Sequence, residues 1–202
     1  LNPDTVLDAL EAAGFVVDGR LLALNSFENR VYQVGLDEGP PVIAKFYRPA
    51  RWSDEAILEE HAFCLELAGH EIPVVPPLVL PSGGTLARHA GYRFAVFTRR
   101  GGRAPELDRR DTLEWIGRFM GRIHAIGAVR PYAHRPALDI ASFGEEPAAY
   151  VLDGGFVPPE LEKVYRGVVA QALDGVRAAF DRAGTVARIR THGDCHVGNM
   201  LW

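Results

Sequence analysis

The stretch Arg190-Thr-His-Gly-Asp-Cys-His-Val-Gly-Asn-Met-Leu-Trp202 decides how the rest of this chain is interpreted. It places an asparagine, Asn199, five residues after an aspartate, Asp194, and a histidine, His192, two residues before that aspartate. This short separation allows a tight loop to fold back, so that the carboxylate and the amide converge on one small volume. We expect His192 to support the loop from behind and residues 200–202 to begin a strand.

An Asp and an Asn at this spacing are typical of a phosphoryl-transfer catalytic loop. In such a loop the aspartate accepts the proton of the attacking hydroxyl, and the asparagine oxygen helps to hold a magnesium ion on the nucleotide phosphates. Asp194 is therefore the candidate proton acceptor, and Asn199 is the candidate magnesium ligand. An ordinary polar turn before a strand has the same local pattern, so other residues must decide.

The composition is that of an ordinary globular protein and excludes several classes of function. Of the 202 residues, 48% are hydrophobic and 24% are charged, which allows a substantial core in one or two domains. No apolar run approaches the roughly 18 residues of a membrane span and no secretory signal begins the chain, so we expect a cytoplasmic protein without a membrane partner. The net charge of -4 gives no support to nucleic-acid binding. We expect a monomer.

Lysine usage draws attention to Lys45, because the 22 basic residues include only two lysines, Lys45 and Lys163. The apolar stretch Val42-Ile-Ala-Lys45 nearly reproduces the V-A-I-K strand, whose lysine pairs with nucleotide phosphates and with a glutamate on the next helix. A compact ammonium group does chemistry that a planar guanidinium group does not. Lys45 is therefore our candidate nucleotide-binding lysine.

The helix that should carry the partner of Lys45 follows directly. Ser53 is a good N-cap, acidic residues follow it, and apolar residues recur at helical spacing until Gly69. Glu60 falls on the inward stripe of this helix, whereas Glu59 projects about 100° further round. We predict that Glu60 pairs with Lys45 and keep Glu59 in reserve; the alternative is that both carboxylates are solvated.

Three strand-like segments precede this helix, at residues 21–24, 30–34 and 42–47, and predict an antiparallel meander. The turn at residues 25–29 lies where a nucleotide kinase places its phosphate-covering loop. Within that turn, Ser26 can offer a hydroxyl and backbone N–H groups to phosphate oxygens. The turn lacks the G-x-G-x-x-G spacing, so an ordinary polar hairpin turn is an equally good interpretation.

The composition changes where a buried strand at residues 92–98 runs into Arg99-Arg-Gly-Gly-Arg103, and we place a boundary there. Residues 1–98 would form an N-terminal nucleotide-binding lobe, and residues 99–202 a C-terminal catalytic lobe, with the hinge at about residues 97–103. In a bilobal kinase, backbone groups near Val96 and Thr98 would bond the adenine edge. A loop after an edge strand is the plainer interpretation of the same residues.

Beyond the hinge the chain becomes helical. Asp108 or Asp111 can cap the first helix, whose apolar stripe ends near Gly127. The elements expected after it are a surface excursion at residues 130–159 with one short helix before Tyr150, a long scaffold helix at residues 160–182, and a strand at residues 186–190 that delivers the catalytic loop.

Taken together, these features resemble a protein-kinase-like fold, and His-Gly-Asp in place of His-Arg-Asp resembles its aminoglycoside phosphotransferase and choline kinase branch. Several stretches, spread over nearly the whole chain, are similar to the bacterial stress response kinase A (YihE/RdoA) family. These stretches are Leu24-Asn-Ser-Phe-Glu-Asn-Arg-Val-Tyr-Gln-Val34, Lys45-Phe-Tyr-Arg-Pro49, Ile57-Leu-Glu-Glu-His61, Phe94-Ala-Val-Phe97 with Gly101-Gly-Arg103, and His192-Gly-Asp-Cys-His196.

The resemblance implies an α+β, bilobal fold with an antiparallel-sheet N-lobe and a mostly helical C-lobe that is truncated in this chain. It implies an ATP- and magnesium-dependent serine/threonine protein kinase of the bacterial cytoplasm. Such an enzyme would act on itself and on protein substrates, in the response to envelope or oxidative stress. Ser26 matches a site contacting ATP, Asp194 the proton acceptor, and Asn199 a magnesium ligand.

The ends of the chain predict a fragment, since it begins at Leu1 rather than Met and stops at Trp202 within an apparent strand. The second magnesium-binding Asp of the family should lie beyond Asn199. If residues 200–202 begin a hairpin, its return strand should present that Asp roughly ten residues after Asn199. The fragment alone should then bind nucleotide poorly and transfer no phosphate.

Three alternatives remain open at this point. A small-molecule phosphotransferase, acting on a hydroxyl of an antibiotic, choline or homoserine, would share the catalytic loop, and a pseudokinase would bind without catalysis. A metal-dependent hydrolase would use His192, Asp194 and His196, three potential ligands on alternate residues. Such a site needs further ligands, and the sequence offers no second His/Asp cluster of matching spacing.

Overall fold

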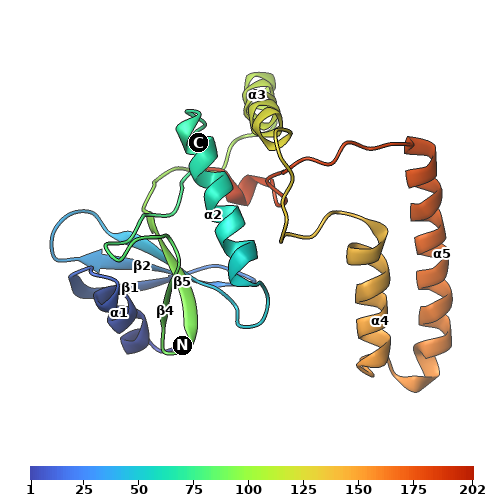
Figure 1. The fold of residues 1–202 in the computed structure, drawn as a ribbon, viewed down its shortest axis with the longest axis horizontal. Coiled ribbons are helices and arrows are strands. Elements are labelled where there is room, and N and C mark those ends of the chain that lie inside the picture. The colour runs from blue at the N-terminus through green and yellow to red at the C-terminus, as the bar shows by residue number, and fades with distance from the viewer. The chain divides into compact units, whose positions relative to one another are not determined.

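The structure is a computed structural model that describes every residue from Leu1 to Trp202 (Figure 1). Backbone contacts divide the chain into two compact units, one made of Leu1–His134 with Arg190–Trp202, and the other of Arg135–Ile189. All the candidate site residues belong to the first unit. The lobes proposed at residues 1–98 and 99–202 rest on a different criterion, the change from strands to helices, and stay a prediction.

The first unit contains a five-stranded antiparallel sheet in the order β1-β2-β3-β5-β4. The strands are β1 (Val17–Leu24), β2 (Arg30–Leu36), β3 (Val42–Phe46), β4 (Ala87–His89) and β5 (Tyr92–Thr98). The predicted meander is therefore confirmed, and β3 is the central strand. Lys45 lies on β3, opposite Val31 of β2 and Ala95 of β5.

The two faces of β3 are covered by different helices. Val42, Ala44 and Phe46 are buried in a core shared with helix α1 (Pro3–Ala12). Because successive strand residues point to opposite faces, Lys45 faces the other way. On that side Tyr47 shares a buried cluster with Ile57 of helix α2 (Asp54–Gly69). The alternation along β3 therefore directs Lys45 toward α2.

Helix α2 begins and ends as the sequence predicts. The Ser53 hydroxyl accepts a hydrogen bond from the Ala56 N–H at 3.1 Å, and acidic residues occupy the first turn, where the helix dipole favours them. Asp54 in that turn also pairs with Arg93 of β5 at 2.9 Å. The N-terminal end of α2 is thus fixed both by its cap and by an ion pair to the sheet.

Helix α3 (Arg110–Gly127) corrects one expectation, because neither Asp108 nor Asp111 caps it. The N-cap residue is Arg109, whose side chain makes no capping bond. Asp111 lies inside the first turn, where its carboxylate is engaged by the Arg109 guanidinium at 2.8 Å. The helix is held instead by its apolar stripe, since Ile123 packs in a buried cluster with residues of α2.

Two segments that the sequence predicts as strands are not strands. At residues 186–190 the one backbone bond to a distant segment runs from the Arg190 N–H to the Gly127 carbonyl, at 3.1 Å. At residues 200–202, Trp202 and Arg103 exchange two backbone hydrogen bonds of 2.8 and 3.3 Å. An extended apolar segment becomes a strand only when a continuous ladder of hydrogen bonds joins it to a neighbouring segment. Each of these two segments is bonded through its backbone to a single residue of a distant segment, so no ladder forms.

The second unit is helical, as expected. A π-helical turn (Ala141–Glu145) leads into helix α4 (Glu146–Asp153), and the long helix α5 (Pro159–Ala183) follows. An apolar cavity of about 210 Å³ lies within this unit, lined by residues that include Phe143, Leu173 and Phe180. No helix of the structure combines the length and the apolar character that crossing a membrane requires.

Gly127 provides a test of how tightly the segment before the catalytic loop is packed. A Cβ atom at Gly127 would lie 2.0 Å from the Arg190 carbonyl oxygen, so Gly127→Ala should lower the free energy of unfolding by about 1–3 kcal/mol. Gly121 lies in the same helix with open space around it, so Gly121→Ala should raise that energy by up to about 1 kcal/mol. Urea unfolding of both variants checks this. Equal stability changes would contradict the packing.

Candidate active site

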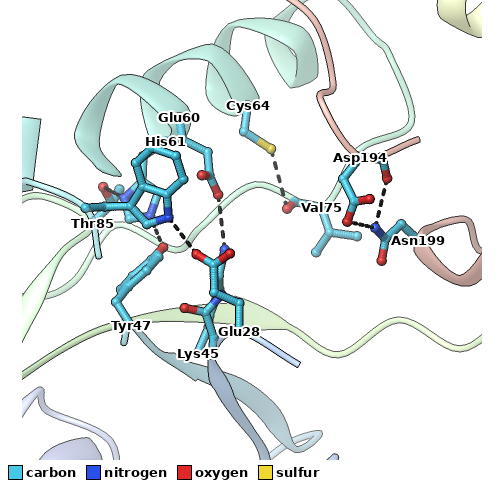
Figure 2. Close-up of polar contacts among 12 residues, drawn as sticks. Glu28, Lys45, Tyr47, Glu60, His61, Cys64, Val75, Thr85, Asp194 and Asn199 are labelled. Carbon is cyan, nitrogen blue, oxygen red and sulfur yellow. Dashed lines mark hydrogen bonds and ion pairs between the residues drawn. The ribbon is translucent and has the colours of Figure 1, made fainter. Parts of the chain in front are cut away.

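Lys45 and Glu60 form an ion pair that joins the central strand to helix α2. The Lys45 Nζ lies 3.1 Å from the Glu60 Oε1, and both side chains are partly exposed (Figure 2). The ammonium also lies 4.9 Å from the centre of the Tyr47 ring, on the same face of the strand. A partly exposed lysine held by a carboxylate and a ring is placed to receive an anionic group from solvent.

Glu59, the reserve partner for Lys45, has other contacts. Its two carboxylate oxygens accept hydrogen bonds from the backbone N–H groups of Ala133 and His134, at 2.6 and 2.8 Å. Adjacent helix residues point about 100° apart, so the two neighbouring glutamates of α2 serve different neighbours. In this structure Glu60, and not Glu59, is the residue that contacts Lys45.

A buried polar chain runs beside this ion pair. The ring of His61, which is 2% exposed, lies between the Tyr47 hydroxyl and the Thr85 hydroxyl, with both contacts at 2.7 Å. Burial lowers the pKa of His61 to about 4, while Glu60 opposes and Lys45 adds to this shift. The ring is therefore neutral at pH 7, and one nitrogen donates while the other accepts.

Sequence reasoning missed this chain of three residues, although a signal was present. Tyr47 follows Lys45 by two residues on one strand face, and His61 follows Glu60 on the helix. Two neighbouring contacts therefore join the strand to the helix, the ion pair between Lys45 and Glu60 and the neutral hydrogen bond between Tyr47 and His61 (Figure 2). The second contact has the geometry to hold the strand and the helix at the separation that the first contact needs.

The loop from Asp194 to Asn199, the predicted catalytic loop, folds back as its spacing predicts. The Asn199 amide nitrogen donates to the Asp194 carboxylate at 2.8 Å and to the Asp194 carbonyl at 2.9 Å (Figure 2). A short 3-10 turn (Val197–Asn199) reverses the chain, and Gly193 has the left-handed φ of 78° that glycine adopts readily. These contacts leave the Asn199 amide oxygen as the acceptor atom, the kind of ligand that magnesium binds.

His192 supports the loop by a single contact, since its Nδ1 accepts from the Asp194 N–H at 3.3 Å. His196 uses its Nδ1 to accept from the Gly198 N–H at 3.1 Å. The two histidines are thus engaged in shaping the loop. No group of three or more His, Cys, Asp or Glu side chains in the chain is arranged to hold a metal ion.

The remaining predicted contacts are spread over the sheet. Ser26 is exposed in the turn between β1 and β2, and that turn is attached to the region before α2 by a 2.7 Å hydrogen bond from the Trp52 indole to Glu28. Val96 is fully buried, and its carbonyl already accepts from the Leu78 N–H at 2.7 Å. Thr98 ends β5. The nucleotide contacts assigned to Ser26, Val96 and Thr98 stay predictions.

A second feature that sequence reasoning missed links α2 to the catalytic segment. Arg190 is 3% exposed and donates to both carboxylate oxygens of Glu66, at 2.7 and 3.3 Å. Hydrogen bonds from Arg190, and then from Arg130, hold the pKa of Glu66 at about 2, well below its ordinary value. The partners are 124 residues apart, so no local pattern could have paired them.

Comparison with known proteins shows the family to which the chain belongs. The sequence profile of the phosphotransferase enzyme family (APH) matches residues 20–202, so the chain belongs to this family. Within it, the chain is a homologue of stress response kinase A. It is 42% identical over all 202 residues to stress response kinase A of Shigella flexneri, and 41% identical to the serine/threonine protein kinase RdoA of Salmonella typhimurium. The chain spans 61% of the length of each.

Solved structures show the same fold. An amicoumacin kinase, hAmiN, in complex with AMP-PNP, Ca²⁺ and Ami superposes with a TM-score of 0.76 and 21% identity, over 98% of this chain and 60% of that one. A microcompartment-associated aminopropanol kinase gives a TM-score of 0.73 and 20% identity, over 99% of this chain and 64% of that one. The predicted α+β kinase-like fold is therefore confirmed.

The buried His61 predicts how stability depends on pH. Its pKa is about 4 in the folded protein and near 6.5 when unfolded, so the unfolded state binds the proton more readily. The stability contributed by the neutral ring is present above pH 6.5 and is lost as the pH falls toward 4, by up to roughly 3 kcal/mol. Urea unfolding of wild type and His61→Gln between pH 4 and 7 tests this. The same slope in both proteins would contradict it.

Proposed function

We propose that the full-length protein carrying this chain is an ATP- and magnesium-dependent serine/threonine protein kinase of the bacterial stress response. The observation that carries the proposal is the Lys45–Glu60 ion pair between the central strand and α2, at 3.1 Å. In phosphoryl transfer such a pair holds the ammonium where it neutralises phosphate charge. The Asp194–Asn199 loop supplies the second part of the machinery.

The residues of the chain have complementary roles in this reaction. Bound MgATP would supply the phosphoryl group and the charge that offsets its negative oxygens. Lys45 pairs with the phosphates, and Ser26 and backbone groups near Val96 and Thr98 contact the nucleotide. Asp194 accepts the proton of the acceptor hydroxyl while the hydroxyl oxygen forms a bond to the γ-phosphorus. The bond between the γ-phosphorus and the oxygen that bridges it to the β-phosphorus breaks, which releases ADP. The Asn199 amide oxygen is the metal ligand.

The metal site needs more than this chain contributes. One amide oxygen is a weak magnesium ligand, because the ion is usually held through one or two carboxylates together with phosphate oxygens. In the full-length protein we therefore place a second magnesium-binding Asp beyond Asn199, roughly ten residues further along the chain. A full-length sequence with no acidic residue in that region would overturn this placement.

The choice of acceptor rests on the relatives. RdoA of Salmonella typhimurium is named a serine/threonine protein kinase, and its identity with this chain extends over all 202 residues. The amicoumacin and aminopropanol kinases share the fold at about half that identity, and fold alone does not determine the acceptor. We therefore place the acceptor hydroxyl on Ser or Thr side chains of proteins, the kinase itself included, in the cytoplasm. We further propose that the enzyme acts as a monomer.

Lys45 gives the first functional prediction. Lys45→Ala removes the ammonium that neutralises phosphate charge, so kcat in the full-length protein should fall by roughly 10²-fold or more while the fold is retained. Lys45→Arg should also fail, because the planar guanidinium cannot occupy the same point beside Glu60. Lys163→Ala is the matched control, since Lys163 is exposed on α5. Near-normal turnover in Lys45→Ala would remove Lys45 from the active site.

Asp194 gives the second functional prediction, and the assay that checks it also shows which kind of molecule accepts the phosphate. Asp194→Ala should lower kcat by about 10²–10⁴-fold and change ATP affinity far less, because a proton acceptor acts on the transfer step.

The same assay identifies the acceptor when labelled ATP is offered with the kinase alone, with protein acceptors, and with aminoglycosides, choline and homoserine. Label on protein supports the proposal, label on a small molecule replaces it, and ATP binding without transfer indicates a pseudokinase. Asp181→Asn, on the exposed surface of α5, is the control.

A further inference from the structure

We propose that Arg190 and Glu66 form a positioning pair that sets the location of the catalytic loop relative to helix α2. This inference rests on the proposed phosphotransfer, in which Lys45 and Asp194 must act on the same phosphoryl group. Glu66 lies on α2, and Arg190 lies four residues before Asp194. Arg190 is therefore a positioning residue, which acts on the reaction through the loop that it holds.

Three hydrogen bonds from the Arg190 guanidinium fix the geometry of the pair. The Nη1 and Nη2 atoms of Arg190 donate to separate carboxylate oxygens of Glu66, at 2.7 and 3.3 Å, and Nη2 also donates to the Ile126 carbonyl at 3.0 Å. A guanidinium bound to both oxygens fixes angle as well as distance. The Arg190 side chain has little freedom to shift while these bonds persist.

Aromatic packing and a backbone contact add to this restraint. The guanidinium carbon lies 4.3 Å from the centre of the Phe63 ring and 5.9 Å from that of Tyr132. The Arg190 N–H donates to the Gly127 carbonyl at 3.1 Å, where even one added methyl group would collide. Main chain and side chain are thus both fixed at the residue where the chain turns into the catalytic loop.

The energetics favour positioning over stability as the reason for this pair. Removing a charge from water is costly, and a buried ion pair seldom stabilises a fold more than apolar residues of the same volume. The Nε of Arg190 is also the one buried side-chain nitrogen or oxygen without a hydrogen-bond partner in the structure. What the pair provides that apolar packing would not is a defined geometry between two segments.

Helix α2 transmits that geometry to the nucleotide side of the site. Glu60 and Glu66 are six residues apart, which corresponds to about 9 Å along a helix axis. Glu60 holds Lys45 at 3.1 Å, and Glu66 holds the segment that leads to Asp194. One rigid helix therefore connects the phosphate-binding lysine and the proton acceptor through two ion pairs.

A further cation on Glu66 allows the role of Arg190 to be isolated. Arg130 donates to the Glu66 Oε2 at 2.8 Å, but its side chain is 60% exposed and it is remote in sequence from the catalytic loop. Arg130→Met removes a contact to the same carboxylate and leaves the Arg190 bonds in place.

The test compares these variants in the full-length protein. Glu66→Gln keeps the shape of the side chain but leaves the buried Arg190 charge without a carboxylate, so its kcat is measured per folded molecule. Glu66→Met with Arg190→Met replaces the pair by apolar groups, so this double variant should fold. We expect kcat to fall about tenfold or more in both, with KM for ATP within about threefold of wild type, because Lys45 and Glu60 stay in place. Arg190→Lys should give a kcat between that of the wild type and those of these two variants, and Arg130→Met should keep wild-type kcat per folded molecule.

Hydrogen exchange gives a readout that does not require turnover. Amides of residues 191–199 should exchange at least about tenfold faster in Glu66→Gln and in the double methionine variant, while those of β3 are unchanged. Wild-type kcat and wild-type exchange in the folded double variant would overturn the inference. A wild-type protein that transfers no phosphate would instead refute the proposed function, and the exchange rates would still decide whether the pair positions the loop.

Discussion

The arrangement of the candidate site depends on the positions of three carboxylates around helix α2, those of Glu59, Glu60 and Glu66. Glu60 faces Lys45 on the central strand, whereas Glu59 and Glu66 contact the segments around residues 133–134 and 190. At 100° per residue, Glu59 and Glu66 lie about 20° apart around the helix axis, and Glu60 lies about 100° from Glu59. The helix therefore presents one acidic face to the sheet and another to the catalytic segment. A rotation of α2 would disturb both sets of contacts together.

The buried groups around α2 follow one rule on charge. Burial lowers the pKa of His61 to about 4 and raises the pKa of the Cys64 thiol to about 11. Each side chain therefore stays in its neutral form, which is the form that burial favours. Arginine cannot do this, because its guanidinium does not deprotonate in proteins. Arg190 therefore needs a carboxylate partner, and Glu66 remains ionised beside it. Arg190, the one charged side chain that is nearly fully buried, thus has a fixed carboxylate partner.

Local patterns predicted the parts of the site that local geometry produces. Strand alternation and helical spacing placed Lys45 and Glu60 on facing elements, and the five-residue separation brought Asp194 and Asn199 together. Contacts between distant segments could not be predicted in this way, which is why the Arg190–Glu66 pair was missed. The same limit explains the strands wrongly expected at residues 186–190 and 200–202, since a strand is defined by its neighbour.

In the proposed reaction, Lys45 and Asn199 would meet the phosphoryl donor, and Asp194 would meet the acceptor hydroxyl. The segments that carry these residues are held against one another within a single unit. A relative named as a protein kinase is similar to this chain in sequence, and solved structures named as small-molecule kinases share its fold at 20–21% identity. A fold common to enzymes named for such different acceptors cannot itself select the acceptor. In the proposed reaction, selection therefore lies in contacts made to the acceptor, while the ion pairs of α2 hold the residues assigned to the transfer step.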